Sequence, residues 1–290
     1  MIADLHAHYP MRVITEMDPD TAAEAMRAGG GATLRDRIRS LVLRVANKLD
    51  NHPSWDGTYR IDPEKLQAGN VRLAMSVHLR PFEEMDLSKP YGAPPEADYF
   101  PGVIADIETV EREVAGHPPE QIRLVHNRAE LDDCLERSSA TALVHAVEGG
   151  CLLGDTPTEI EANCAELAKR GVGYVTVAHL FYRQVATNAN AIPFAPDFVY
   201  DLFFPQRGKD RLTPRGEAVV RGLVRNRIMI DLSHMDPAGI KETFEFLDEV
   251  DPTSEVPVIS THAGYRFGKQ QYMCDEEILL QIKRRKGVVG

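Results

Sequence analysis

The sequence predicts an α/β protein with the parallel (β/α)8 barrel of the TIM type. From residue 104 onward, short apolar segments alternate with segments of helical periodicity, which is the pattern of parallel β/α units. Several apolar segments are followed closely by a histidine or a glutamate, and the carboxyl ends of barrel strands form the rim that carries functional groups. A doubly wound open sheet is the alternative fold. Such a sheet gathers its site at one switch point rather than at successive strand ends, so we favour the barrel.

The first hundred residues alternate less regularly. Two segments have helical character, and the first ends at three consecutive glycines, which terminate helices. One apolar segment predicts a strand, and a Pro-rich stretch after it predicts a surface loop. In order, these two helices, the strand and the loop are residues 21–29, 33–51, 71–77 and 89–101.

The later elements are better marked. Thr213-Pro214 and Asp236-Pro237 each place a capping side chain before a proline at the first helical position, which starts a helix. Strands are predicted at residues 122–125, 141–147, 173–178, 228–232 and 256–260, and another begins at 288. Helices are predicted at 104–115, 128–137, 158–170, 213–227, from 236, and 275–285, with a long loop at 181–211.

The composition limits the class of partner. The chain of 290 residues suits one large α/β domain or two small ones, and we expect a single domain over 1–290. Its net charge of −11 argues against nucleic acid or an anionic membrane as a partner. No basic segment followed by a long apolar run marks a secretory leader, and no apolar run is long enough to cross a membrane. Four cysteines without C-x-x-C spacing predict free thiols. We therefore expect a cytoplasmic protein.

Five side chains predict a metal site. His6 and His8 are spaced i, i+2, so on a strand they would share one face and could bind one ion. Glu148, His234 and His262 each come just after an apolar segment, where the predicted strands end. More than four protein ligands, one of them a carboxylate able to bridge, indicate two divalent ions close together.

The chain resembles the membrane dipeptidase (renal dipeptidase-like, peptidase M19) family of the metal-dependent amidohydrolase superfamily. Its motifs resemble the family's D-G-H-x-D-x-P, E-G-G, L-T-L-T-H with D-N-A, L-T-x-x-G to D-x-S-H, and P-x-x-x-S-H. They run in the family order over nearly the whole chain. In this sequence they are residues 4–10, 147–150, 175–179 with 188–189, 212–216 with 230–234, and 257–262.

The resemblance implies a (β/α)8 hydrolase with two zinc ions bridged by Glu148. The implied reaction is attack of a metal-bridging hydroxide on the scissile amide of a dipeptide, often one with a D-configured C-terminal residue. The other implied ligands are His6 and His8 for one ion, and His234 and His262 for the second.

A second set of residues is expected to contact the small peptide or amide substrate. The resemblance implies that His179 is catalytic and hydrogen-bonds the carbonyl oxygen or the tetrahedral intermediate. Tyr182, Arg183 and Asn188 lie on the long loop after His179 and are candidates for substrate contact. Arg266 is a candidate for holding the substrate carboxylate.

The sequence departs from the family pattern at three places. His8 stands where the family has Asp, although the wider superfamily has H-x-H there. Gln271 falls near the family's carboxylate-binding Arg, so Arg266 or Lys269 would have to substitute. The sequence ends at Gly290, about where the seventh strand begins, whereas the family's proton-shuttling Asp follows the eighth strand. We therefore expect the C-terminal part of the barrel, with that Asp, to lie beyond this chain.

Two alternatives to a dipeptidase remain open. The altered carboxylate-binding segment suggests an amidohydrolase that acts on another small amide or ester. The missing Asp suggests a metal-binding homologue without hydrolytic activity. An aromatic cluster on the long loop either covers the pocket or forms the interface of a homodimer, and its members are Phe198, Tyr200, Phe203 and Phe204.

Three further residues have structural or functional interpretations. His145 is out of phase with the inward alternation set by Glu148 and Ala146, which favours a place on the back of the strand or contact with a helix. His78, at the end of a predicted strand, either lines the pocket or packs in the interior. Asp231 either orients a metal ligand or makes an internal structural hydrogen bond.

Overall fold

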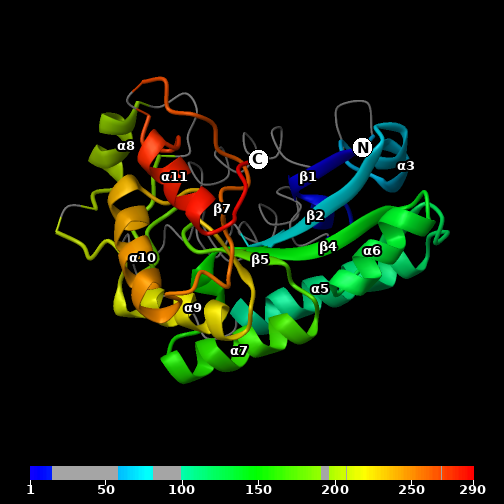
Figure 1. Cartoon of the computed structure of the whole chain (residues 1–290), viewed down its shortest axis with the longest axis horizontal. Coiled ribbons are helices and arrows are strands. Elements are labelled where there is room, and N and C mark those ends of the chain that lie inside the picture. Colours follow the sequence, from blue (N-terminus) through cyan, green and yellow to red (C-terminus); the bar gives the residue numbers. More distant parts are fainter. Residues whose placement is uncertain (15–57, 81–98, 191–195, 207, 269) are drawn as a thin grey trace, which may run out of the picture. The chain divides into compact units, whose positions relative to one another are not determined.

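A computed structural model describes residues 1–14, 58–80, 99–190, 196–206, 208–268 and 270–290 (Figure 1). The chain divides into two compact units, residues 1–90 with 102–145 and residues 91–101 with 146–290. The predicted helices at 21–29 and 33–51, and most of the predicted loop at 89–101, lie outside the described residues.

The first unit contains parallel strands and the helices that connect them. β1 pairs with β2, β2 neighbours β4, and β3 pairs with β4. The strands are β1 (Ile2–Ala7), β2 (Val71–Leu79), β3 (Ile122–Leu124) and β4 (Thr141–Glu148), the last of which ends in the second unit. The helices are the 3-10 turn η1 (Tyr9–Arg12), α3 (Pro63–Ala68), α5 (Tyr99–Ala115), which begins in the second unit, and α6 (Arg128–Arg137).

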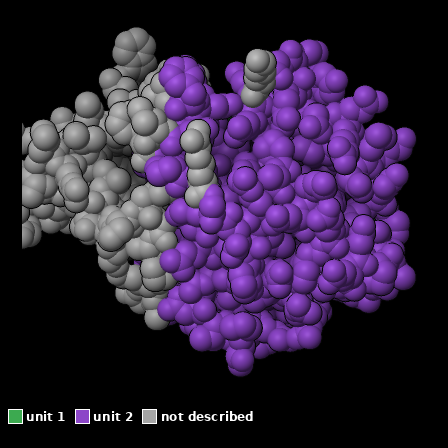
Figure 2. All heavy atoms as spheres, turned by 90° about the vertical axis from the view of Figure 1, so that its left-hand side faces the viewer, with its two compact units in different colours: residues 1–90, 102–145 green, residues 91–101, 146–290 purple. Residues whose placement is uncertain are grey.

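The second unit continues the same pattern. Its strands follow the order β4–β5–β6–β7, and every pairing is parallel. The strands after β4 are β5 (Tyr174–Thr176), β6 (Met229–Asp231) and β7 (Val258–Ile259). The helices are the 3-10 turn η3 (Gly150–Leu153), α7 (Pro157–Lys169), α8 (Asp197–Phe203), α9 (Pro214–Arg225), α10 (Pro237–Val250) and α11 (Glu276–Arg284). Figure 2 presents the surface of this unit in purple.

Capping side chains start the helices where the sequence predicts them. The Thr213 hydroxyl accepts a hydrogen bond from the Gly216 amide, and an Asp236 carboxylate oxygen accepts one from the Gly239 amide. The strand predicted at 288 is also present in part, because Ser260 forms a parallel bridge with Val289. These contacts confirm the predicted alternation of parallel strands and helices.

Three element predictions were wrong. α3 was not predicted, although Asp62 caps it and Pro63 opens it. α5 begins at Tyr99, inside the segment predicted as an irregular loop. α8 lies within the predicted loop at 181–211, and it has no side-chain cap at its start. Its Tyr200 is buried and donates a hydrogen bond from its hydroxyl to the carbonyl oxygen of Leu180, outside the helix, so tertiary contacts rather than a local signal support this helix.

The cysteines form no disulfide bond, as predicted. Burial raises the pKa of the Cys164 thiol to about 12, so this thiol is protonated and unreactive at neutral pH. Among the described residues, no helix is both long and apolar enough to span a bilayer. All four cysteines are buried, and none of them is in a disulfide bond: Cys134, Cys151, Cys164 and Cys274.

A buried histidine pair lies inside the first unit. His78 Nε2 is 2.9 Å from His145 Nδ1, and neither side chain reaches the solvent. His145 Nε2 is 3.9 Å from a carboxylate oxygen of Glu111 on α5, which confirms the predicted contact between His145 and a helix. Burial, and then the neighbouring His145, hold the pKa of His78 well below its usual value.

This pair makes stability depend on pH. His78 stays neutral in the folded chain but ionises below about pH 6.5 when unfolded, so the unfolded state then binds more protons. The free energy of unfolding should be constant above about pH 6.5 and fall below it, by at most about 1.4 kcal/mol per pH unit from this residue. Urea unfolding between pH 5 and 8 measures this slope.

Comparison of variants isolates the contribution of His78. His78→Gln should flatten the acid slope, because glutamine does not titrate. An identical slope in wild type and His78→Gln would contradict the prediction.

Candidate metal centre

Glu148 is placed by the two glycines that follow it. It ends β4 with 1% of its surface exposed. Gly149 has φ +118°, a conformation that L side chains rarely adopt, and this turns the chain at the strand end. At Gly150 a Cβ would lie 2.7 Å from the carbonyl oxygen of Val177, so only glycine fits there. The Glu-Gly-Gly motif is therefore explained by backbone geometry around a buried carboxylate.

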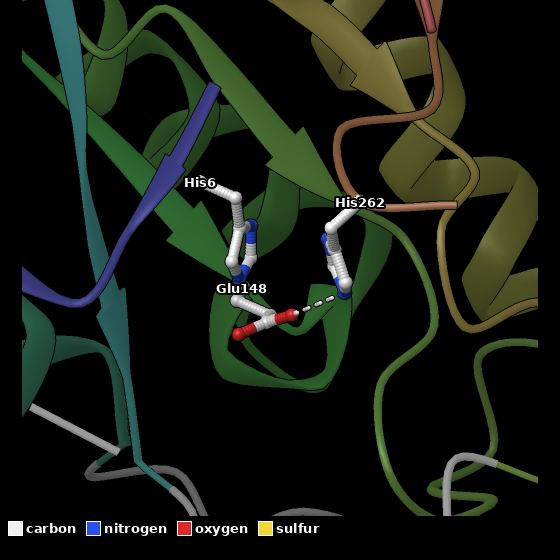
Figure 3. A group of neighbouring side chains, drawn as sticks. All are labelled: His6, Glu148 and His262. Atoms are coloured by element: carbon white, nitrogen blue, oxygen red, sulfur yellow. Dashed lines mark ion pairs between the residues drawn. The ribbon is translucent and has the colours of Figure 1, made fainter. Parts of the chain in front are cut away.

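Three imidazoles surround this carboxylate. His179 Nε2 lies 3.4 Å from Glu148 Oε2, and His234 Nε2 lies 3.1 Å from Oε1. His262 Nε2 is 3.7 Å from Oε1, and Figure 3 marks this ion pair with a dashed line. The side chains come from positions just after β5, β6 and β7, because the carboxyl ends of parallel strands meet at one edge.

The arrangement of donor atoms fits a divalent metal ion. His234 Nε2 and His262 Nε2 approach within 2.8 Å, and one donor atom from each of Glu148, His179 and His234 lies within 4.8 Å of the others. Three imidazoles around one carboxylate are the ligand types that zinc and similar ions take in proteins. His234 also has φ +67°, an unusual backbone conformation for histidine that directs it into the cluster at a cost in strain.

Asp231 organises the backbone behind the imidazoles. It is fully buried, and one of its carboxylate oxygens accepts hydrogen bonds from the Ser233 hydroxyl at 2.8 Å and the Thr261 amide at 3.0 Å. The other oxygen accepts from the hydroxyls of Thr176 at 2.7 Å and Thr261 at 2.9 Å. The carboxylate of Asp231 can keep its negative charge away from solvent because several hydrogen-bond donors surround it.

This network sets the tautomer of His262. The Thr261 hydroxyl donates its proton to Asp231, so its oxygen can only accept at the 2.8 Å contact with His262 Nδ1. His262 therefore carries its proton on Nδ1 and turns the lone pair of Nε2 toward Glu148 and His234. The predicted internal hydrogen bonds of Asp231 are confirmed. Through Thr261 the carboxylate also reaches His262, and its role in orienting a metal ligand stays a prediction.

His6 and His8 belong to the first unit, and His6 is also labelled in Figure 3. His6 Nε2 and His8 Nε2 lie 3.0 Å apart, which confirms that the H-x-H spacing puts both imidazoles on one face. The segment after them is held by Tyr9, whose hydroxyl donates to Glu113 on α5 at 2.8 Å and accepts from Arg12 at 2.9 Å.

Sequence reasoning did not assign Tyr272 to the site. Its ring centroid is 5.1 Å from that of His234, edge to face, and 6.0 Å from that of His262. Burial, and then the charges of Glu148 and Asp231, raise the pKa of its phenol. An aromatic residue in an irregular segment carries no periodic signal, so only the structure brings it to the imidazoles.

The long-loop residues that were predicted to contact substrate make contacts with other residues of the second unit. Tyr182 is buried, with the Lys209 ammonium 3.9 Å from its ring centre. Arg183 is buried and donates a hydrogen bond to the Tyr99 hydroxyl at 2.9 Å. Asn188 is buried, and its side-chain amide donates to two backbone carbonyls of its own loop. Their roles in substrate binding stay predictions.

Arg266 is also engaged inside the second unit. Its guanidinium donates to the carbonyl oxygens of Met273 at 2.9 Å and Gln271 at 3.3 Å, and it pairs with Asp275 at 3.2 Å. The arginine therefore anchors the segment that precedes α11. Lys269, the other predicted substitute, lies outside the described residues.

The fold and this cluster together define an α/β protein with a candidate metal centre after its parallel strands. The family model of the membrane dipeptidases (peptidase family M19) matches residues 31–290, and the chain belongs to this family. The match begins after His6 and His8, so their assignment depends on the motif at residues 4–10.

The chain is also similar to individual dipeptidases and to a metallo peptidase. Dipeptidase 3 of Mus musculus is 28% identical over 192 residues, which cover 64% of this chain and 33% of that protein. A metallo peptidase from Rhodobacter sphaeroides, solved with a phosphinate mimic of the dipeptide L-Ala-D-Ala, matches with a TM-score of 0.60 and 18% identity, over 86% of this chain and 69% of that one. The probable dipeptidase PvdM from Pseudomonas aeruginosa matches with a TM-score of 0.56 and 19% identity, over 82% of this chain and 54% of that one.

These comparisons confirm the predicted α/β barrel class of fold. The matched region spans only one third of the mouse relative and about half of the Pseudomonas protein. The single-domain organisation and the assignment of each site residue stay predictions.

Proposed function

We propose that this protein is a metal-dependent dipeptidase that hydrolyses the amide bond of a dipeptide. The observation that carries the proposal is the buried carboxylate of Glu148 with three imidazole nitrogens within 3.7 Å. Membership of the membrane dipeptidase family supports this activity over other uses of such a cluster. The solved relative that carries a phosphinate dipeptide mimic supports the class of substrate.

We propose zinc as the metal, with two ions bridged by Glu148. His234 and His262 would hold one ion, and the motif at residues 4–10 supports His6 and His8 as ligands of the other. Ions in such a site lower the pKa of bound water and polarise a carbonyl group.

The protein's own residues supply the positioning. Thr261 and Asp231 hold the Nε2 lone pair of His262 toward Glu148, so this ligand needs no reorientation when a metal binds. His179, which is 5% exposed and lies beside Glu148, would donate a hydrogen bond to the carbonyl oxygen of the substrate.

A second candidate is an amidohydrolase that acts on another small amide or ester. It is favoured by Arg266, because the side chain predicted to hold the substrate carboxylate instead anchors the Gln271 and Met273 carbonyls. A substrate without a free carboxylate would need no such arginine.

Assays of the purified full-length protein test both candidates. The protein would be stripped with a chelator, reloaded with Zn2+, analysed for metal, and assayed with L,L- and L,D-dipeptides, their C-terminal amides and simple esters. We expect close to two ions per chain and hydrolysis of dipeptides that is lost on stripping. Hydrolysis of amides or esters alone would support the second candidate. Metal-loaded protein that hydrolyses none of these compounds would overturn both and leave a metal-binding homologue.

A further inference from the structure

Tyr272 lies on a segment that is tied to the end of β7 by its backbone. The Arg266 amide donates to the Cys274 carbonyl at 2.8 Å, and the Cys274 amide donates to the Gly264 carbonyl at 2.9 Å. Tyr265 and Cys274 form a parallel bridge at the same place. The segment therefore returns toward the strand end just after Tyr272.

The side chain of Arg266 then fixes both neighbours of Tyr272. Its guanidinium donates to the carbonyl of Gln271, immediately before the tyrosine, and to that of Met273, immediately after it. The Gln271 amide also donates to a carboxylate oxygen of Asp197 on α8 at 3.3 Å. A tyrosine side chain has only two rotatable bonds, so a fixed backbone on either side leaves the ring few positions, and packing on the imidazoles selects the one observed.

The ring of Tyr272 lies against the face of the candidate metal centre that the imidazoles of His234 and His262 form. The ring stands perpendicular to His234 and is tilted by 53° to His262, with centroids 5.1 and 6.0 Å away. These are the two imidazoles whose Nε2 atoms approach Glu148 and each other. The aromatic body of Tyr272 therefore packs on the proposed ligands themselves.

The hydroxyl of Tyr272 makes no hydrogen bond with any residue that the structure describes, although the side chain is half-buried. It lies near enough to Glu148 and Asp231 for their charges to act on it. A phenol is a hydrogen-bond donor at neutral pH, and a substrate that displaces water from this half-buried hydroxyl has to offer it an oxygen acceptor instead. A substrate oxygen at the metal centre would supply that acceptor.

We propose that Tyr272 is a further catalytic residue, and this inference rests on the proposed dipeptidase activity. Its O–H donates a hydrogen bond to the carbonyl oxygen of the scissile amide and strengthens that bond as negative charge develops on the oxygen. Tyr272 keeps its proton throughout, so it stabilises the transition state without being a general acid. Arg266 is a positioning residue that acts through the backbone of Tyr272.

The substitution Tyr272→Phe tests the hydroxyl while keeping the ring. We expect kcat for dipeptides to fall by about 10²-fold and KM to change by less than about 3-fold, as for loss of a donor that acts on the transition state. Binding of a phosphinate dipeptide mimic, measured by calorimetry, should weaken by about tenfold or more because the phosphinate oxygens imitate that charge. Bound zinc per chain should be unchanged.

Tyr265→Phe is the matched control, because Tyr265 lies on the same segment with its ring against the exposed Phe267. It should leave kcat, KM and phosphinate binding at wild-type values. A Tyr272→Phe enzyme with wild-type kcat and phosphinate affinity would overturn the inference while leaving the dipeptidase proposal intact. Wild-type protein that neither cleaves dipeptides nor binds the phosphinate would instead overturn the proposed function, and this inference with it.

Discussion

Glu148→Gln is expected to remove bound metal and to lower the rate of dipeptide hydrolysis by about 10³-fold or more. The substitution keeps the shape of the side chain but removes the negative charge at the centre of three imidazoles. Neutral imidazoles alone attract a divalent cation less strongly, and an amide cannot bridge two ions as a carboxylate does. Metal analysis and initial rates measure the two effects.

In the metal-free protein, the same substitution should leave thermal stability unchanged or raise it. A carboxylate that is 1% exposed has lost most of its hydration, and its removal relieves that cost. The melting temperature of stripped Glu148→Gln should therefore equal or exceed that of stripped wild type. Added Zn2+ should stabilise wild type, by about 2.7 kcal/mol at a hundredfold excess over Kd, and leave the variant unchanged.

Glu242→Gln provides the control for Glu148→Gln. Glu242 is half-buried on α10 and accepts a hydrogen bond from the Leu212 amide at 2.8 Å. It should retain metal and activity. Retention of two zinc ions and wild-type turnover by Glu148→Gln would contradict the placement of Glu148 in the centre.

Asp231→Asn is expected to damage stability and metal affinity together. The buried carboxylate accepts from the hydroxyls of Thr176 and Thr261, and the new amide group would direct hydrogens toward such donors. We expect a loss of about 3 kcal/mol in the free energy of unfolding, since bonds to a charged group contribute about 1.5–3 kcal/mol each. The melting temperature should fall by several degrees.

Metal affinity should fall because the Thr261 hydroxyl loses the acceptor that directs it. The tautomer of His262 is then no longer fixed, and loss of such an orienting contact typically lowers metal affinity by about 10–100-fold. Competition with a chromophoric chelator measures this change.

Asp251→Asn separates the two effects of the Asp231 substitution. Asp251 is also buried, and it accepts from the amides of Glu255 and Val256 and pairs with Arg285, apart from the histidine cluster. It should lose stability and keep its metal affinity. Equal metal affinity in Asp231→Asn and wild type would refute the orienting role of the Asp231–Thr261 pair.

Local chemistry accounts for most of what the sequence predicts about the fold. Thr213 and Asp236 cap helices through contacts three residues away, so the residues that decide the start are adjacent in the chain. The misses have physical reasons. α3 spans only Pro63–Ala68, which is too short to display a helical period despite its Asp62 cap. α8 has no cap and depends on burial of Tyr200, which local sequence does not encode.

The same distinction applies to the candidate centre. Glu148, His234 and His262 could be predicted because a parallel sheet brings strand ends together whatever the details of packing. Tyr272 could not, because its position depends on the Arg266 side chain binding carbonyls several residues away. The engagement of Arg266 also had no sequence signal, since hydrogen bonds from a side chain to distant backbone follow no period.

Position 234 has two requirements, a left-handed backbone conformation and an imidazole side chain. At φ +67° a glycine or asparagine would relax the chain, whereas only histidine offers an imidazole to Glu148. Residues that favour folding and residues that favour metal binding are therefore different at position 234. Laboratory evolution that selects for thermal tolerance alone would drift away from histidine there, and retention of His234 in a stabilised lineage would be a record of selection for catalysis.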